Sequence, residues 1–498
     1  MLPRPAPPRA GRFIPALGIE APMADQTPLA TIAIIGGGFT GAAVALHLVE
    51  RFPPDEARII VFEPRERLGA GLAYDTADPV HRINVPAARM SIYPDDPEDF
   101  SRWLEQTEEL KADPQAFTAE GVPFPRRQAF GLYIAARLAP FVASGAVEHW
   151  RSTAVEANQV DGLWTIRTGD GRQVQAHGVV LAVSHPAPSL PASLRAIENH
   201  PGLVADATRP NALAKVSPQA RVLVVGNGLT AADVIASMKE RGHRGSILSI
   251  SRRGLRSRGH PSIEQSVTLD LTTTPSQRAS HLLNRIRRTV REANAAGLTW
   301  HPVLDAVRAQ GQEIWKSLPV SERRRIARHI RPFWDVHRFR IAPQVEKALD
   351  DAIADGSLTV KAASLRGAEA VGDAIRVILK ERGSTEPGSQ DFDTVIVTTG
   401  PAHGGILQSQ PLLASLAAKG RLALCPTGLG LLCDRQSRAL AVTGGADDTL
   451  LIAGPLARGT FGELMGLPQV SEHALFIAEK TANLIETRQL SCRKQNAR

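Results

Sequence analysis

Two stretches of the chain share one order of hydrophobic and polar positions. In TIAIIGGGFTGAAVALHLVER, a short run rich in β-branched residues (31–35) leads through glycines into a segment with apolar residues at helical spacing. In RVLVVGNGLTAADVIASMKERG, which begins at Arg221, the same order returns. We therefore predict two units of strand, glycine turn and helix, one in each half of the chain.

Each unit is followed by a stretch in which apolar and polar residues alternate, as in half-buried strands. The first, AVEANQVDGLWTIRTGDGRQVQAHGVVLAVSHP, has GDG as a hairpin turn and closes in an apolar strand. The second, LTVKAASLRGAEAVGDAIRVILKE, is followed by the apolar strand DTVIVTTGP. This duplicated order predicts an α/β fold with two Rossmann-like dinucleotide-binding domains and β-meanders, the glutathione-reductase-like flavoprotein architecture.

Composition narrows the classes of function. The 498 residues carry a net charge of +8, but they contain no zinc-finger spacing and no RNP-like motif, so we expect a basic enzyme for phosphorylated cofactors and no nucleic-acid partner. Three cysteines without a CxxC pair exclude a disulfide framework and indicate a reducing, cytoplasmic compartment. Residues 28–49 are uncharged, yet four clustered glycines argue against a membrane span. The sequence leaves the oligomeric state open.

The first glycine turn has the spacing that dinucleotide binding requires. In GGGFTG, Gly36 permits a tight turn, Gly38 lets a pyrophosphate approach the backbone, and Gly41 lets the helix pack against the strand. Glu63 ends the next strand, RIIVFE, where a carboxylate accepts hydrogen bonds from a ribose diol. A nucleotide with a free ribose, FAD or NAD, fits this pattern; a glycine-rich turn without ligand is the alternative.

The second turn carries the opposite charge at its strand end. Its glycines are Gly226 and Gly228, with Ala231 in the third place. Where a carboxylate is usual, SILSISRRG places Arg252 and Arg253, and guanidinium groups bind a 2′-phosphate that a carboxylate would repel. We therefore expect NADP(H) here, unless the two arginines face solvent or a partner carboxylate.

These assignments divide the chain into parts. The N-terminal residues are rich in Pro, Ala and Arg and lack the apolar core of a signal peptide, so Met23 is an alternative start. The expected parts are a disordered extension (1–27), the first part of a FAD-binding domain (28–200), an NADP-binding domain (201–390) with a helical insert (275–350), the second part of the FAD-binding domain (391–486) and a tail (487–498).

Several motifs, taken together and in order, resemble one protein group. Between residue 31 and about residue 480, the chain resembles the bacterial FAD/NAD(P)-binding proteins of the YdhS-like group and, more distantly, flavin-containing and N-hydroxylating monooxygenases. The motifs are GGGFTGAAVALHL, RLGAGLAYDT, HRINVPAARMSIYPDDPEDFSRWL, VVGNGLTAADV, SRRGL, RHIRPFWDVHRFRIAP, FDTVIVTTGP and GPLARGTFGE.

The resemblance implies further site residues. It implies that the first glycine motif and Glu63 hold FAD, and that Asn84, Arg89 and Met90 lie near the flavin ring. Arg89 would then favour the reduced, anionic flavin, and an ordinary surface ion pair is the alternative.

Other parts of the resemblance concern the closing strands and the C-terminal loop. In this architecture the last helix begins at the flavin, so the loop from Gly454 to Glu463 is a candidate contact, or simply a helix cap. The second closing strand ends in the expected Gly400. Two features depart from the pattern: Ala182, Val183 and Ser184 close the first meander without a glycine, and Phe339 stands where a second histidine is expected.

The insert is rich in arginine and contains the acid–base candidates. Helical spacing would place Arg324, Arg328 and Arg331 on one face, which is either solvated or binds an anionic substrate. Trp300 and Trp334 are candidate pocket walls, although tryptophan is often simply part of a core. We expect His260, His301 or His337 to move protons, with His301, His337 and Arg89 as the catalytic candidates.

These observations predict a FAD-dependent NAD(P)H oxidoreductase that transfers hydride from NADPH to FAD. Without a CxxC motif a dithiol relay beside the flavin is excluded, which leaves oxygen or another small acceptor. We expect a monooxygenase that acts on a small molecule, with no metal site and no membrane partner. The alternatives are a flavin reductase with a quinone or other small acceptor, and a non-catalytic redox sensor or scaffold that binds FAD.

Overall fold

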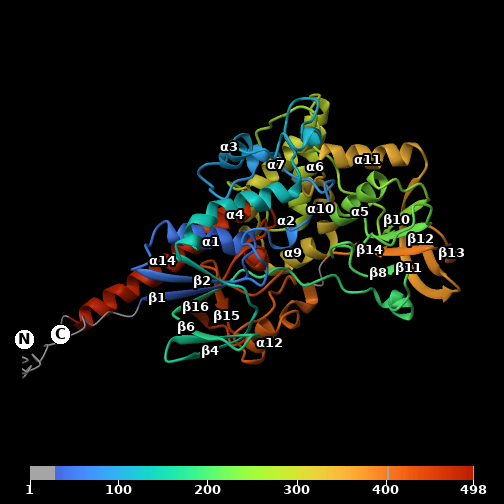
Figure 1. Ribbon diagram of the computed structural model, residues 1–498. Coiled ribbons are helices and arrows are strands. Elements are labelled where there is room, and N and C mark those ends of the chain that lie inside the picture. The colour runs from blue at the N-terminus through green and yellow to red at the C-terminus, as the bar shows by residue number, and fades with distance from the viewer. Residues whose placement is uncertain (1–28, 401–402, 497–498) are drawn as a thin grey trace, which may run out of the picture.

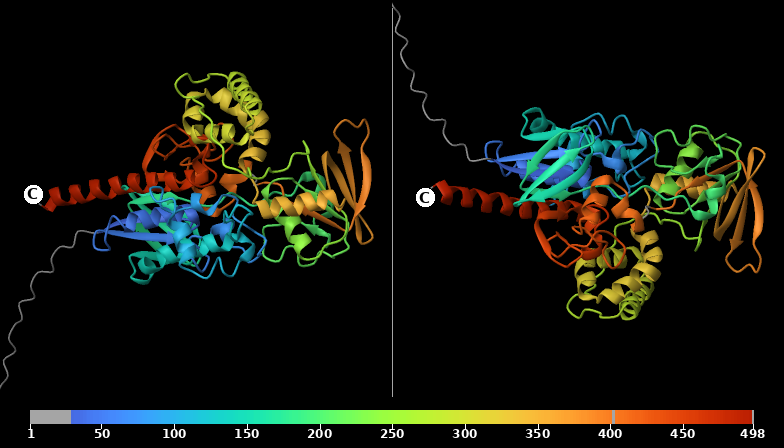
Figure 2. Two further views of the ribbon diagram at one scale, coloured as in Figure 1. Left: turned by 90° about the horizontal axis from the view of Figure 1, so that it is seen from above. Right: turned by 90° about the horizontal axis from the view of Figure 1, so that it is seen from below.

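The structure, a computed structural model, describes residues 29–400 and 403–496. Two bodies, each built on a largely parallel sheet, lie next to one another, and a group of helices stands out beside them (Figures 1 and 2). A small antiparallel sheet completes the first body. This is the α/β flavoprotein fold with two parallel-sheet dinucleotide-binding domains, so the predicted fold class is confirmed.

The first sheet has six strands in the order β15-β16-β7-β1-β2-β3. All neighbours pair in parallel except β15, which runs antiparallel to β16 at the edge. Every residue of β1 is buried, as expected for a central parallel strand that is covered on both faces. The strands are β1 (Ala30–Ile35), β2 (Ala57–Phe62), β3 (Val147–Trp150), β7 (Gly178–Leu181), β15 (Arg438–Leu440) and β16 (Ala446–Ile452).

Helices cover this sheet, and the predicted first meander is present. Helix α1 (Phe39–Val49) packs against both α4 (Arg127–Ala143) and α14 (Gln469–Asn496). The contact with α14 brings the C-terminal helix of the chain against its first helix. The meander forms the separate antiparallel sheet β4-β5-β6, with β4 (Ala154–Val160), β5 (Leu163–Thr168) and β6 (Gln173–Ala176). The remaining elements before the second body are α2 (Gly71–Tyr74), η1 (Ala87–Arg89), α3 (Asp99–Glu105), η2 (Pro114–Ala116) and η3 (Ala192–Ile197).

The second sheet has seven strands in the order β13-β12-β11-β10-β9-β14-β8. The long strand β11 pairs in parallel with β10 and then turns into an antiparallel hairpin with β12. The strands are β8 (Leu203–Val204), β9 (Val222–Val225), β10 (Ile247–Ser251), β11 (Leu358–Val371), β12 (Ala374–Glu381), β13 (Gly388–Phe392) and β14 (Thr394–Val397).

Three expected boundaries change. Strand β14 pairs with β9, so the expected boundary at residue 390 falls inside the second sheet. Helix α11 (Pro343–Ala354) packs against α5 (Leu229–Glu240) as the crossover between β10 and β11, so the insert ends before Pro343. Helix α14 continues to Asn496, so the expected tail is helical as far as that residue. The expected extension and the alternative start at Met23 lie outside the described residues.

The insert itself is entirely helical. It contains α6 (Ala279–Ala295), α7 (His301–Ala309), α8 (Gly311–Ser317), α9 (Val320–Arg325), a π-helical turn η4 (Ile326–Ile330) and α10 (Arg331–Arg338). Helix α8 contacts the C-terminal segment of the first body through α13 (Arg458–Phe461). The other C-terminal elements are η5 (His403–Gln408), α12 (Pro411–Ala418) and η6 (Gly454–Ala457). Across residues 29–400 and 403–496, no helix is both long and apolar enough to span a membrane.

Candidate functional site

The first glycine turn is closely packed by its own backbone and by the closing strand. Gly36 has φ +100°, and a Cβ there would lie 2.7 Å from the carbonyl oxygen of Ala182. A Cβ at Gly41 would lie 1.9 Å from the carbonyl oxygen of Gly36. Only glycine fits these two positions without displacing backbone. The closing strand thus reaches the turn, although it ends in Ala182, Val183 and Ser184 without the glycine that we expected.

Glu63 lies directly beneath this turn. Its side chain is buried, Oε2 accepts the N–H of Gly37 at 3.1 Å, and Oε1 accepts from the Arg65 N–H at 3.1 Å and Nη1 at 3.0 Å. Helix α1 begins beside it without an acidic residue in its first turn and without a side-chain cap, so its N–H groups are suited to an anion. The carboxylate and the helix end together fit the ribose and pyrophosphate of FAD.

The second turn has the same backbone geometry. Gly226 has φ +125°, and a Cβ there would lie 2.7 Å from Oγ1 and 2.8 Å from the carbonyl oxygen of Thr398. No described atom lies within 4 Å of a Cβ placed on Gly228, so the loop keeps the open space that a pyrophosphate needs. Gly400 lies beyond β14 and is exposed, with equally open surroundings.

Asn227 was not anticipated from the sequence, although it lies inside the second glycine motif. Its buried side chain accepts a hydrogen bond from Ser249 Oγ at 2.6 Å and donates one to Ser251 Oγ at 3.2 Å. The turn is therefore tied to the end of β10, where the arginine pair begins. Arg252 is exposed and Arg253 lies over the Phe333 ring at 4.9 Å. Within the described part of the chain, no carboxylate forms an ion pair with either arginine.

The segment expected beside the flavin is joined to the insert. His260 Nε2 lies 3.1 Å from the carbonyl oxygen of Asn84, and Met90 is buried in the core. Arg89 is half exposed and forms an ion pair with the exposed Glu264. Because Glu264 offsets its charge, the pair argues against Arg89 as an isolated cation near a flavin.

Two of the candidate histidines lie together around Trp300. His301 stacks on that ring with centroids 3.7 Å apart, and His337 meets it edge-on at 4.7 Å. Arg340 lies over the same ring at 5.2 Å and forms a two-point ion pair with Asp305.

The surroundings keep two histidines neutral. Burial lowers the pKa of His260 to about 4, and burial is also the main cause of the lowered pKa of His301, with the Arg340 charge second. His301 Nε2 faces the carbonyl oxygen of Gly259 at 3.3 Å, and Nδ1 faces Thr299 Oγ1 at 2.9 Å. Both imidazoles are therefore unprotonated at neutral pH. The described residues contain no group of three or more His, Cys, Asp or Glu that could hold a metal ion.

The C-terminal loop closes on the first glycine turn. Gly454 has φ +63°, and a Cβ there would lie 2.5 Å from Thr40 Oγ1 in α1. The Gly454 N–H donates to His473 Nδ1 at 3.1 Å, and His473 Nε2 lies 3.0 Å from Ser437 Oγ. Burial lowers the pKa of His473 to about 3, so it stays neutral. The loop is thus held against the helix end that fits the pyrophosphate.

Sequence reasoning missed a cluster of buried and partly buried ions between the insert and this loop. We call Arg331, Arg338, Arg458, Asp335 and Glu463 the arginine cluster. Arg338 Nε donates to Glu463 at 2.6 Å, Arg331 Nε donates to Asp335 at 3.0 Å, and Arg458 Nη2 lies 3.8 Å from Asp335. Burial lowers the pKa of Arg458 to about 10 and raises that of Asp335. No local pattern signals that Arg458 is buried.

The expected arginine face does not form. Arg324 and Arg328 are exposed, whereas Arg331 turns inward to Asp335. The reason is the π-helical turn Ile326–Ile330, which changes the angular spacing that a continuous α-helix would have kept. Trp334 lines a cavity beside this turn, and Trp300 does not.

Comparisons with known proteins agree with this geometry. Residues 33–186 match the sequence profile of a family described as FAD-NAD(P)-binding. No curated protein matches the chain. Solved structures share the fold at low identity. An ornithine hydroxylase from Pseudomonas aeruginosa is 16% identical with a TM-score of 0.62, and the match covers 92% of this chain and 99% of that one. An L-lysine 6-monooxygenase from Pseudomonas syringae is 20% identical with a TM-score of 0.58, and the match covers 92% of this chain and 99% of that one.

A third structure, the ornithine N-hydroxylase of Kutzneria sp. 744 with reduced FAD, NADP⁺ and L-ornithine, is 17% identical with a TM-score of 0.58 and covers 93% of this chain and 100% of its own. At these identities the likeness extends to the fold alone. The chain therefore shares the fold of these flavoproteins, and its residues 33–186 match an FAD-NAD(P)-binding family.

Proposed function

We propose that the chain is a FAD-dependent NADPH oxidoreductase, and specifically a monooxygenase that acts on a small molecule with oxygen. The observation that supports this most is the pair of glycine turns with opposite charges at their strand ends. Glu63 is buried under one turn, and Arg252 and Arg253 follow the strand beside the other without a carboxylate partner in the described chain. One site thus suits a free ribose and the other a 2′-phosphate.

We assign one set of site residues to FAD and another to NADP(H). The proposed FAD contacts are Gly36, Gly38, Gly41, Glu63, Asn84, Met90, Gly454 and Glu463; Arg89, which is paired with Glu264, is left out. The proposed NADP(H) contacts are Gly226, Gly228, Arg252, Arg253 and Gly400. Bound FAD supplies hydride acceptance and onward transfer of electrons to a small acceptor. The protein orients the two nucleotides and holds their phosphates at the N-termini of α1 and α5.

Proton transfer is the proposed task of the insert histidines. The neutral His301 is the candidate acceptor, because its lowered pKa leaves the imidazole unprotonated at neutral pH. His337 contacts the same Trp300 ring and donates from Nδ1 to the carbonyl oxygen of Phe333 at 2.7 Å. His301 lies on α7 and His337 on α10, and the packing of these two helices holds both histidines beside Trp300.

Anaerobic reduction tests the first half of this proposal. The purified yellow protein is mixed with NADPH or NADH without air, and flavin absorbance is followed. Rapid bleaching by NADPH, with slower bleaching by NADH, is expected. Absence of bleaching with both nucleotides would overturn hydride transfer and leave a redox sensor or scaffold.

Reoxidation in air tests the second half. Product formation coupled to NADPH consumption, in a screen of small substrates, supports the monooxygenase. Stoichiometric peroxide release with every substrate, or electron transfer to a quinone alone, would instead identify a flavin reductase.

A further inference from the structure

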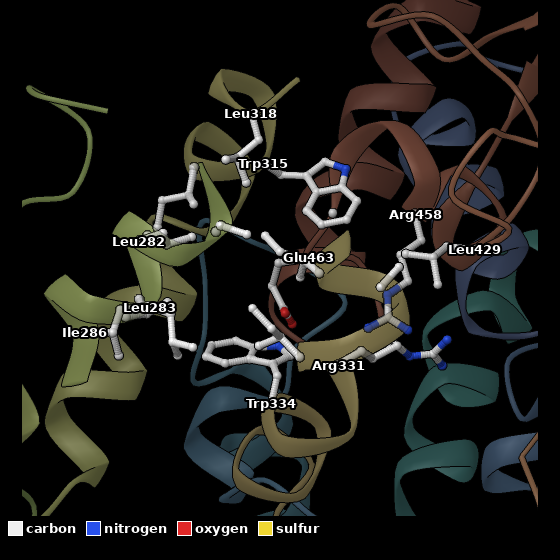
Figure 3. A pocket seen from close by; sticks show the side chains of 18 residues that line it. Leu282, Leu283, Ile286, Trp315, Leu318, Arg331, Trp334, Leu429, Arg458 and Glu463 are labelled. Carbon is white, nitrogen blue, oxygen red and sulfur yellow. The ribbon is translucent and has the colours of Figure 1, made fainter. Parts of the chain in front are cut away.

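A largely apolar cavity lies between the insert and the C-terminal loop of the first body. It contains about 820 Å³ of empty space, part of which is open to solvent. Leucine and isoleucine side chains of α6 line one end, and Trp315 and Trp334 stand on opposite sides (Figure 3). Arg458 and Arg331 lie at the other end, and in this view the Glu463 carboxylate lies between the two tryptophans (Figure 3). A ligand with an apolar body and a charged head fits this distribution.

The walls of the cavity are fixed by close packing. Trp315 Nε1 donates to the carbonyl oxygen of Gly459 at 3.0 Å, and a Cβ on Gly462 would lie 2.5 Å from Cγ of Trp315. The π-helical turn Ile326–Ile330 forms another wall, and such turns occur often at functional sites. The cavity is therefore part of the folded architecture, with a glycine retained where the indole needs room.

Arg458 is the unusual residue of this site. Its side chain is 5% exposed, and within the described part of the chain neither Nε nor Nη1 has a hydrogen-bond partner. Its third nitrogen, Nη2, lies 3.8 Å from Asp335, which is too long for a hydrogen bond. A guanidinium without partners at this depth is costly, and a carboxylate can bind it through two parallel hydrogen bonds.

The charges around Arg458 also leave room for one anion. The arginine cluster contains three guanidinium groups (Arg331, Arg338 and Arg458) and two carboxylates (Asp335 and Glu463), which leaves one positive charge. Arg308 adds another positive charge near Glu463, and it donates hydrogen bonds to the uncharged Leu467 carbonyl and Gln469 side chain. A buried excess of positive charge favours a bound anion.

We propose that this cavity binds the substrate, an apolar monocarboxylate whose chain lies between Trp315 and Trp334 and whose carboxylate pairs with Arg458. The substrate role rests on the proposed function; the binding site does not. The apolar end excludes a second charge, which distinguishes this ligand from a zwitterionic amino acid.

Binding is measured first, on the FAD-loaded protein without NADPH. Isothermal titration calorimetry with decanoate, decanol and decylamine, together with tryptophan fluorescence, should give saturable binding of decanoate. In Arg458→Gln the decanoate affinity should fall about 10- to 100-fold, the range expected for a hydrogen bond to a charged group, while decanol binding changes less than about twofold. The control Arg325→Gln removes an exposed arginine of the same insert and should change neither.

A second variant distinguishes loss of the binding site from loss of binding through misfolding. Ile286→Trp fills the apolar end of the cavity and should abolish binding of both decanoate and decanol while thermal unfolding stays cooperative. No saturable binding of decanoate, or equal decanoate affinity in the wild type and Arg458→Gln, would overturn the site. Unchanged decanoate binding in Ile286→Trp would place the ligand elsewhere and overturn it too.

The substrate role has its own readout. Decanoate should accelerate NADPH oxidation in air and lower the yield of peroxide per NADPH in the wild type but not in Arg458→Gln. Binding without either change would overturn the substrate assignment. Failure of NADPH to bleach the flavin would overturn the proposed function alone, because the calorimetric result does not depend on it.

Discussion

The two glycine turns have the same backbone conformation but different neighbouring residues. Gly36 and Gly226 both have positive φ, and in each case a closing strand leaves no room for a Cβ. The third motif position differs: a Cβ at Gly41 would overlap the Gly36 carbonyl oxygen, whereas the second unit carries a buried Ala231 there. Helix α1 therefore packs so closely against its glycine turn that no Cβ fits at the third motif position. Helix α5 leaves room for the Cβ of Ala231 at that position.

The residues next to the turns differ in charge. In the first unit a carboxylate, Glu63, accepts the Gly37 N–H. In the second, the neutral side chain of Asn227 links the turn to Ser249 and Ser251, directly before two arginines. Under the proposed function, the shared backbone geometry binds the pyrophosphate that both nucleotides have, and the different strand ends bind their different riboses. Four predictions test this comparison.

The largest effect is expected at the third motif position. Gly41→Ala places a methyl group 1.9 Å from a backbone oxygen and should lower the free energy of unfolding by about 3 kcal/mol or more, the upper end of overpacking costs. The matched change Ala231→Gly should cost about 1 kcal/mol through helix propensity. Urea denaturation of both variants measures this. Equal losses would mean that the two helices pack alike.

A pH effect on the stability of the first body is expected at His473. Its folded pKa of about 3 lies below the usual 6.5, so the unfolded chain binds more protons below pH 6.5 and stability falls as pH falls. The expected loss is up to about 1.4 kcal/mol per pH unit between pH 6.5 and pH 4.

The variant His473→Asn keeps an acceptor near the Gly454 N–H and should flatten this pH dependence. His281→Asn, at an exposed position of the insert, serves as the control and should leave the slope unchanged. Parallel pH curves for the wild type and His473→Asn would contradict the role of His473.

The next effect concerns the acid of the first unit. Glu63→Gln removes the charge that accepts from Gly37 and Arg65, and FAD affinity should fall by about 1.5 to 3 kcal/mol, the range for hydrogen bonds to charged groups. FAD retained after dialysis and titration of the apoprotein measure it. Glu66→Gln, at an exposed neighbour, should behave as the wild type. A loss of NADPH affinity instead of FAD affinity would reverse our assignment of the two turns.

The smallest effect is expected at the arginine pair. Arg252→Ala or Arg253→Ala should weaken NADPH by about 1 to 3 kcal/mol and leave NADH nearly unchanged, because only NADPH carries the 2′-phosphate. Stopped-flow reduction with each nucleotide measures it, and Arg366→Ala, at an exposed position of β11, is the control. Equal losses for both nucleotides would show that the arginines are structural.

The fold class and the two glycine turns could be predicted because they depend on residues that are close together in the sequence. A glycine with positive φ, a strand end at a fixed distance and an alternating meander are all set by neighbours within one supersecondary unit. The fold class and the two turns therefore follow from short stretches of sequence. The boundary near residue 390 could not be placed in this way, because β14 pairs with β9 at a long sequence distance.

The amino-acid sequence alone thus determined the two nucleotide-binding units and the charge at each strand end. The tertiary structure decided which charges stay exposed and which are buried. Arg89 pairs with Glu264, Arg331 turns inward behind a π-helical turn, and Arg458 lies buried against a cavity whose walls come from both the insert and the C-terminal loop. Burial and electrostatic pairing depend on segments that meet only in the folded chain, so no local pattern reveals them.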